Sequence, residues 1–204
     1  MDRLVICISG GGSLLPPIAE AIEAGRIDAR IALVISDRSG IPGVKKARTL
    51  GLKTICVDRE KFRGENGRVS YAALSEAVLD AAEGISGGRP DMIVLAGFLS
   101  ILKGRILEKY AGRIINTHPA LLPKHGGKGM YGMRVHRAVL EAGDRESGCT
   151  VHYVDAGIDR GPIILQRRIP VLPGDTDEDL RERIHGIEGK ALTEAIGLAL
   201  ARKK

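Results

Sequence analysis

The chain has 204 residues, of which 44% are hydrophobic and 27% are charged, a balance typical of a globular protein. It contains no apolar run near the roughly 20 residues that span a bilayer and no sign of a secretion signal, so we expect neither a membrane-spanning nor a secreted protein. The 31 Lys and Arg exceed the 25 Asp and Glu by 6. With no Trp, two Phe and four Tyr for base stacking, this excess favours small anionic ligands over nucleic acid.

The three cysteines, Cys7, Cys56 and Cys149, are an odd number, and no pair of them has the spacing of zinc ligands. A reducing, cytoplasmic location without a structural metal is therefore expected. Gly makes up 27 of the 204 residues, which predicts many tight turns or loops that pass close to a ligand.

The first half of the chain alternates buried-strand patterns with amphipathic helix patterns. Continuous apolar runs predict strands at 4–8, 31–36, 52–57 and 92–96, and helical spacing predicts helices at 14–25, 44–50 and 69–82. Such βαβ alternation indicates a parallel sheet with helices on both faces. The glycine-rich stretch 83–90 is interpreted as a surface loop rather than a domain boundary.

The second half continues this alternation. Strands are predicted at 113–116, 149–154 and 163–166, and a short helix at 135–142. A final helix follows the acidic segment 175–178, which suits a helix N-terminus. No internal repeat or linker is evident, so residues 1–204 are expected to form a single α/β domain.

Ligands of open α/β sheets bind beyond the carboxyl ends of the strands, and the first such end is the glycine loop Ser9–Ser13. Backbone N–H groups there, followed by a helix N-terminus, could hold a phosphate. The alternative is a tight turn that needs glycine. The loop lacks the Gly-Lys-Ser/Thr ending of a P-loop, and Leu15 stands where a dinucleotide fingerprint requires a small residue.

At the end of the strand predicted at 113–116, Asn116 and His118 are two residues apart, so both side chains can lie on one face of an extended segment. An amide that donates to a developing oxyanion and an imidazole that exchanges a proton would suit a reacting carbonyl. A histidine satisfied by the fold, next to a Pro-bounded turn, is the alternative interpretation.

The loop Asp155–Pro162 lies between two predicted strands and carries two carboxylates. An aspartate close to His118 would favour the protonated imidazolium. The alternatives are an Asx turn for Asp155 and a surface ion pair of Asp159 with Arg160. The other histidines within the fold, His125, His136 and His152, are interpreted as structural.

Four segments taken together resemble the folate-dependent formyltransferase family: Ile8–Ser13, Leu95–Phe98, Asn116–Pro123 and Gly157–Pro162. The resemblance runs in order along nearly the whole chain. It implies a Rossmann-like formyltransferase fold, with a mostly parallel twisted sheet of about seven strands. The implied reaction transfers the formyl group of 10-formyltetrahydrofolate to the amine of glycinamide ribonucleotide in de novo purine (IMP) biosynthesis.

The resemblance also implies roles for individual residues. His118 corresponds to the catalytic acid, Asn116 to its amide neighbour, and Asp159 to the carboxylate that keeps the imidazole protonated. The implied ribonucleotide contacts are Gly12, Ser13, Leu14, His185, Gly186, Ile187 and Glu188. The implied folate contacts are Arg68, Leu99, Ser100, Ile101, Leu102, Asn116, Asp155, Ala156, Gly157, Ile158 and Asp159. No metal is implied, and the partners are small molecules taken up by a monomer or homodimer.

Three positions depart from the pattern of well-known members: Leu14 replaces an Asn at the phosphate, Ser100 an Arg at the folate, and His185 a Gln at the ribose. The glycine-rich segment 124–133 suits either a mobile lid or a flexible surface loop. Two other family members share the same core, formyltetrahydrofolate hydrolase and methionyl-tRNA formyltransferase, and they remain alternatives. A non-catalytic nucleotide- or RNA-binding module is the alternative from another class.

Overall fold

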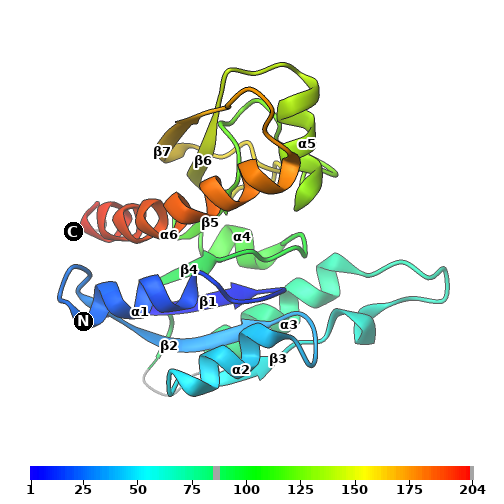
Figure 1. Ribbon diagram of the computed structural model, residues 1–204. Coiled ribbons are helices and arrows are strands. Elements are labelled where there is room, and N and C mark those ends of the chain that lie inside the picture. The colour runs from blue at the N-terminus through cyan, green and yellow to red at the C-terminus, as the bar shows by residue number, and fades with distance from the viewer. Residues whose placement is uncertain (85–87, 203–204) are drawn as a thin grey trace. The chain divides into compact units, whose positions relative to one another are not determined.

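The computed structural model describes residues 1–84 and 88–202 (Figure 1). The strands are β1 (Asp2–Ile8), β2 (Ala29–Ser36), β3 (Thr54–Cys56), β4 (Met92–Leu95), β5 (Ile114–His118), β6 (Glu146–Tyr153) and β7 (Ile163–Pro170). They form one sheet in the order β3-β2-β1-β4-β5-β6-β7. The pairs β1–β2, β1–β4 and β2–β3 are parallel and β6–β7 is antiparallel, which confirms the predicted mostly parallel α/β sheet.

The helices are α1 (Leu15–Glu23), α2 (Pro42–Thr49), the 3-10 helix η1 (Arg59–Phe62), α3 (Tyr71–Glu83), α4 (Arg105–Lys109), α5 (Met133–Glu141) and α6 (Asp177–Ala201). The chain divides into two compact units, Met1–Ile115 and Asn116–Lys204. Among the described residues, no helix is long and apolar enough to cross a membrane.

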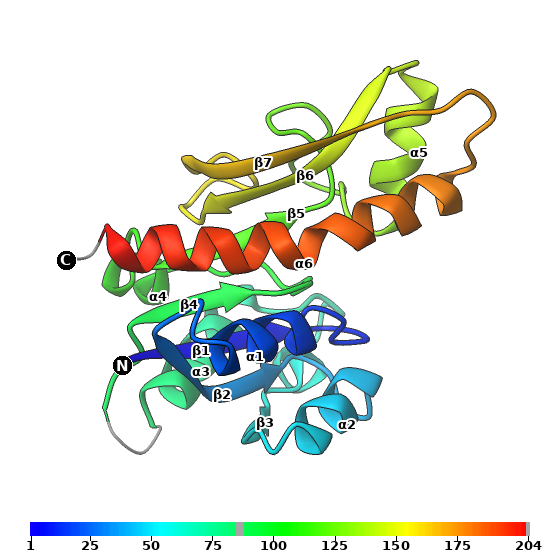
Figure 2. The same ribbon diagram turned by 60° about the vertical axis from the view of Figure 1, so that its left-hand side comes forward.

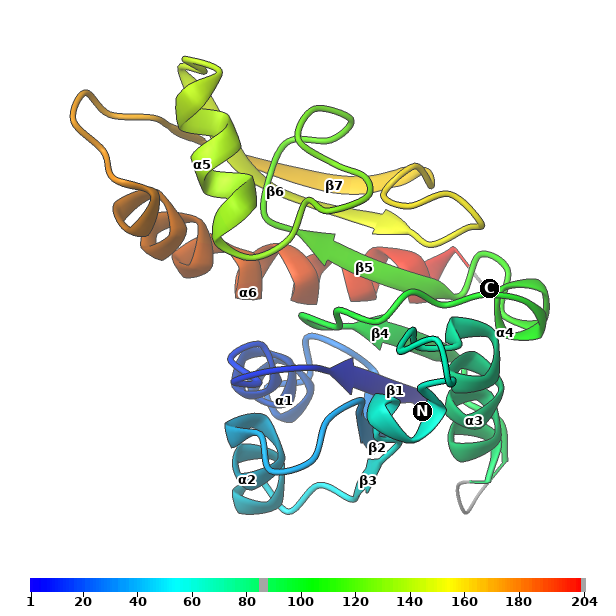
Figure 3. The same cartoon turned by 90° about the vertical axis from the view of Figure 1, so that its right-hand side faces the viewer.

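In the first unit, α1 and α2 lie on one side of the strands and α3 and α4 on the other (Figure 3). Because helices cover both faces, the strands between them contain long apolar runs, and Leu4–Ile8 of β1 are fully buried. The first turn of helix α1 contains Pro16 and Pro17, whose fixed φ suits a position where no N–H is needed.

In the second unit, β6 and β7 pair as an antiparallel ribbon, and the 25-residue helix α6 packs along both strands and against α5 (Figure 2). Thr150 of β6 ties this ribbon to the segment that follows β5. Its hydroxyl donates to the Ala120 carbonyl at 2.7 Å and accepts from the Leu122 N–H at 3.0 Å. The Gln166 amide of β7 donates to the Leu122 carbonyl at 2.9 Å. These bonds hold the chain in place just after Asn116 and His118.

Several element boundaries differ from the sequence prediction for local reasons. Helix α3 begins at Tyr71 rather than 69, because the Ser70 hydroxyl accepts from the Ala73 N–H and so sets the N-terminus. Strand β7 continues past 166 to Pro170, where pairing with β6 stabilises residues that lack an apolar pattern. The short helices η1 and α4 contain too few residues to show a period. The loop expected at 83–90 lies partly outside the described residues.

Helix α6 offers a test of how its N-terminus is stabilised. Thr176 and Asp179 form a capping box in which each side chain accepts from the other residue's N–H. We expect Thr176→Ala to lower the free energy of unfolding by about 1 kcal/mol in urea titrations. Thr193→Ala is the matched control, because Thr193 lies within the same helix and bonds back to the Gly189 carbonyl, so alanine there should not destabilise. Equal losses in both variants would contradict this account.

Candidate functional site

The glycine loop after β1 is held tightly against the start of α2. The Gly43 N–H donates to the Gly10 carbonyl at 3.0 Å, and a Cβ at Gly43 would lie only 2.6 Å from that oxygen. Gly12 has a φ of 61°, which favours glycine. Within the described residues of the first unit, the N–H groups of residues 10–14 make no main-chain hydrogen bond. The loop therefore presents the unpaired donors that an anion would accept.

At the end of β4, the chain turns back toward this loop. The Leu99 N–H donates to the Ser9 hydroxyl at 2.7 Å, and the Ser100 hydroxyl donates to Asp37 at 2.6 Å. Ser100 and Asp37 are both buried, so the Ser100 side chain is engaged by the protein. Arg68 is exposed in the segment that follows η1, where its own N–H donates to the Asn66 side chain.

In the second unit, β5 places His118 in an almost closed environment, with 4% of its side chain exposed. Its Nε2 lies 2.8 Å from the His125 carbonyl, which can only accept, so this nitrogen carries a proton. Its Nδ1 lies 3.7 Å from an Asp159 carboxylate oxygen, too far for a hydrogen bond but close enough for charge attraction. Both ring nitrogens of His118 thus face oxygen atoms.

Asp159 reaches this position from the loop between β6 and β7, in a left-handed conformation with a φ of 54°. Only 12% of its side chain is exposed, and Oδ2 accepts from the Gly127 N–H at 2.9 Å. Gly126 allows this approach, because a Cβ there would collide with Leu122 and lie 3.2 Å from Asp159 Cβ. Asp155, by contrast, accepts from the Gly157 N–H at 2.8 Å in the Asx turn that was its alternative interpretation.

His152 of β6 also lies in this cluster, although sequence reasoning placed it with the structural histidines. Its Nε2 lies 3.1 Å from Asn116 Nδ2 and 3.7 Å from Asp159 Oδ1. Burial lowers the pKa of His152 below its ordinary value, against opposing contributions from the Tyr153 carbonyl and Asp159. The sequence held a signal for the position of His152 near the carboxylates, because this histidine stands only three residues before the loop that carries Asp155 and Asp159.

Helix α6 approaches the end of β5 through Glu188. One carboxylate oxygen lies 3.5 Å from the Thr117 hydroxyl, and the other lies 3.4 Å from His185 Nδ1. The structure therefore brings two of the predicted ribonucleotide residues, His185 and Glu188, to the strand that carries Asn116 and His118. Glu188 also raises the pKa of the Cys149 thiol, although burial is the larger cause.

Asp144 anchors the start of segment 124–133 through the side chains of Lys124 and His125. This carboxylate pairs with Lys124 and lies 2.7 Å from His125 Nε2, and these hydrogen bonds hold its pKa below the ordinary range. Because the carbonyl of His125 faces His118, the anchor also fixes an acceptor of the catalytic candidate. Sequence reasoning did not identify this main-chain contact.

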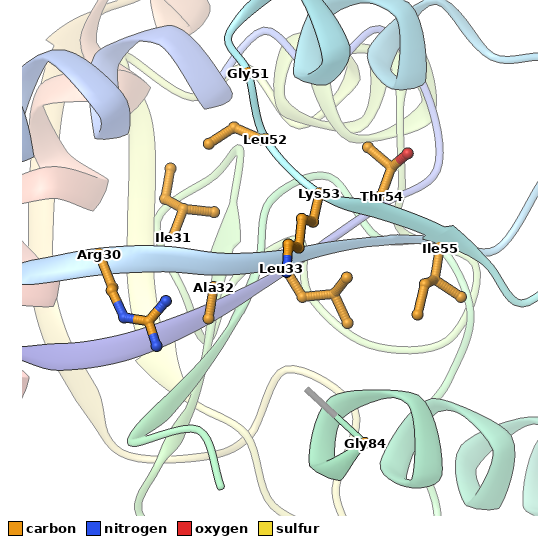
Figure 4. A pocket seen from close by; sticks show the side chains of 10 residues that line it. All are labelled: Arg30, Ile31, Ala32, Leu33, Gly51, Leu52, Lys53, Thr54, Ile55 and Gly84. Atoms are coloured by element: carbon orange, nitrogen blue, oxygen red, sulfur yellow. The ribbon is translucent and has the colours of Figure 1, made fainter. Parts of the chain in front are cut away.

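A hollow in the first unit lies elsewhere, along the edge of the sheet (Figure 4). It is lined by residues 30–33 of β2, residues 51–55 around β3, and Gly84. These residues are not at the carboxyl end of β2, and no titratable cluster gathers among them. Over the described residues of the whole chain, no group of three or more His, Cys, Asp or Glu is placed to hold a metal ion.

A family profile described as formyl transferase matches residues 2–196. The chain is 36% identical over 182 residues to phosphoribosylglycinamide formyltransferase of Escherichia coli (strain K12). This match covers 89% of the chain and 79% of the E. coli protein. The chain is also 36% identical over 200 residues to the trifunctional purine biosynthetic protein adenosine-3 of Drosophila melanogaster, covering 96% of this chain and 14% of that protein. The chain thus spans about a seventh of the fly relative's length.

Among solved structures, glycinamide ribonucleotide transformylase 1 from Symbiobacterium toebii superimposes with a TM-score of 0.83 at 40% sequence identity. The match covers 99% of this chain and 89% of that chain. The similarity in fold therefore extends over both compact units.

Two buried histidines predict how stability depends on pH. Burial lowers the pKa of His136 and of His152, so below about pH 6.5 the unfolded chain binds protons that the folded chain does not. We therefore expect the free energy of unfolding to fall between pH 7.5 and pH 5.5. In His136→Gln this fall should be smaller, as measured by urea unfolding at both pH values. An equal or larger fall in the variant would contradict the assignment.

Proposed function

The chain belongs to the formyl transferase family, and we propose that it transfers the formyl group of 10-formyltetrahydrofolate to the amine of glycinamide ribonucleotide, in de novo purine (IMP) biosynthesis. The observation that carries the proposal is the cluster in which the rings of His118 and His152 flank the largely buried Asp159 carboxylate and the Asn116 amide lies against His152. The names of the relatives from E. coli and S. toebii support the choice of the acceptor amine.

In the proposed mechanism the amine of the ribonucleotide attacks the formyl carbon directly. The new C–N bond turns the formyl oxygen into an oxyanion, which the Asn116 amide and the protonated His118 stabilise. The bond to the folate nitrogen then breaks and that nitrogen takes a proton from His118. The proton that the attacking amine loses returns to His118 and restores the imidazolium. Asp159 favours the imidazolium without touching the reacting atoms. No covalent enzyme intermediate or metal takes part.

The substrate contacts are proposed by role. The free N–H groups of Gly12, Ser13 and Leu14 suit the phosphate, and since the Leu14 side chain is buried, it would contribute only its N–H. His185–Glu188 suit the ribose and glycinamide end. Arg68, Leu99–Leu102, Asn116 and Asp155–Asp159 would contact the folate. With Ser100 bonded to Asp37, that position would offer the folate no cation.

We assign the enzyme to the cytoplasm, with small-molecule substrates and a monomeric or homodimeric state. Cys7, Cys56 and Cys149 are free thiols, as a reducing compartment requires. Burial raises the pKa of Cys149 to about 12, so this thiol remains protonated and inert at neutral pH.

An absorbance assay of folate deformylation tests the proposal. With 10-formyltetrahydrofolate, we expect turnover that depends on glycinamide ribonucleotide, and a fall in kcat of about 100-fold to 1000-fold in His118→Ala or Asn116→Ala. Formate release without the ribonucleotide would point instead to the hydrolase. Turnover only with methionyl-tRNA would point to the tRNA enzyme. No turnover, together with salt-dependent affinity for polyanions, would support the binding module.

The role of Asp159 predicts a change in pH dependence. In Asp159→Asn the negative charge beside the imidazolium is lost, so the basic limb of the pH–rate profile should move to lower pH. Asp155→Asn is the comparison variant, because its carboxylate binds Gly157 in the same loop, and it should leave the position of the limb where it is. An unmoved limb in Asp159→Asn would remove Asp159 from this role.

A further inference from the structure

His152 is almost fully enclosed, with 2% of its side chain exposed, and both of its ring nitrogens have defined neighbours. Nδ1 lies 2.9 Å from the Tyr153 carbonyl, and Nε2 lies 3.1 Å from the Asn116 amide nitrogen. A carbonyl oxygen can only accept, so Nδ1 must carry the proton. In the neutral ring Nε2 is then an acceptor, which fits the N–H groups of the Asn116 amide.

This tautomer decides which way the amide of Asn116 faces. An amide rotated by half a turn would place its oxygen against the lone pair of Nε2, an unfavourable pair in a buried site. With the nitrogen against His152, one N–H is donated to the ring and the second N–H remains for another acceptor. The geometry points to His152 as the positioning residue that holds the Asn116 amide with this second N–H available to the oxyanion. This inference rests on the proposed function of Asn116.

The charged groups around His152 explain why its neutral form matters. Asp159 Oδ1 lies 3.7 Å from Nε2, and Asp155 favours a charged ring, whereas burial and His118 oppose it. A proton on Nε2 would turn that nitrogen into a donor that repels the Asn116 N–H groups. It would also give Asp159 a second imidazolium besides His118. Because the ring of His152 is neutral, the negative charge of Asp159 remains available to pair with His118.

Nuclear magnetic resonance of the intact wild-type protein tests the tautomer without any activity assay. In protein labelled with ¹⁵N-histidine, with the His152 signals assigned by their loss in His152→Gln, we expect a protonated Nδ1 and an unprotonated Nε2. This state should persist at about pH 6, where an ordinary histidine is largely charged. A proton on Nε2 at neutral pH would overturn the inference.

Kinetics of variants test the positioning role. His152→Phe keeps a ring but removes the acceptor. It should lower kcat about tenfold or more while changing the KM for the folate and the KM for the ribonucleotide by less than about threefold. His152→Gln can turn its amide oxygen toward Asn116 and should retain kcat within about threefold. In the Asn116→Ala background, His152→Phe should lower kcat by less than about twofold, because the residue it acts through is gone. Additive losses would overturn the inference.

Val151→Ala is the matched control for disturbance of the strand. Val151 is the neighbouring fully buried residue of β6, and its side chain lies on the opposite face, so this variant loses stability without touching Asn116. It should keep kcat within about twofold, measured on samples whose folding has been checked by thermal unfolding. If wild-type protein shows no ribonucleotide-dependent turnover, the proposed function fails, whereas the tautomer measured by resonance still decides the His152–Asn116 contact.

Discussion

A carboxylate withdrawn from water must find its stabilisation within the protein, and Asp159 imposes this constraint on the whole cluster in the second unit. It accepts from one main-chain N–H, that of Gly127, and its two oxygens face the rings of His118 and His152. The two rings cannot both be charged beside a single carboxylate without excess positive charge. One ring has to remain neutral, and that ring is His152, because burial lowers its pKa below the ordinary value.

The scaffold around Asp159 consists largely of contacts that limit movement. Gly161 follows soon after, and a side chain there would overlap the Tyr153 carbonyl, so the two ends of the loop can approach only with glycine. Thr150 and Gln166 hold the segment after β5 by three hydrogen bonds. The acid and the amide thus come from β5 and the carboxylate from the loop between β6 and β7, and each segment is fixed by its own local contacts. Preorganisation of this kind lets donors act without reorganising during a reaction.

Much of this architecture could be predicted from the sequence, because the information was local. Apolar runs such as Leu4–Ile8 predicted strands buried on both faces. The spacing of Asn116 and His118 predicted two polar side chains on one face of a strand. The neighbour of Asn116 could not be predicted, since His152 is 36 residues away and its alternation suits an ordinary core position. The extension of β7 to Pro170 likewise depends on a partner strand rather than on its own residues.

The His125 contact has a consequence for how variation in this segment can be read. The atom that faces His118 is a carbonyl oxygen, which every amino acid possesses, whereas the His125 side chain faces away to Asp144. What the position demands is a backbone path, with a φ of 55° at His125 and no Cβ at the next residue. A comparison of side chains alone would therefore notice the contact of His125 with Asp144 and miss the oxygen that residue 125 presents to His118. The constraint lies in the backbone conformation of this segment, and Gly126 is the residue whose identity reveals it.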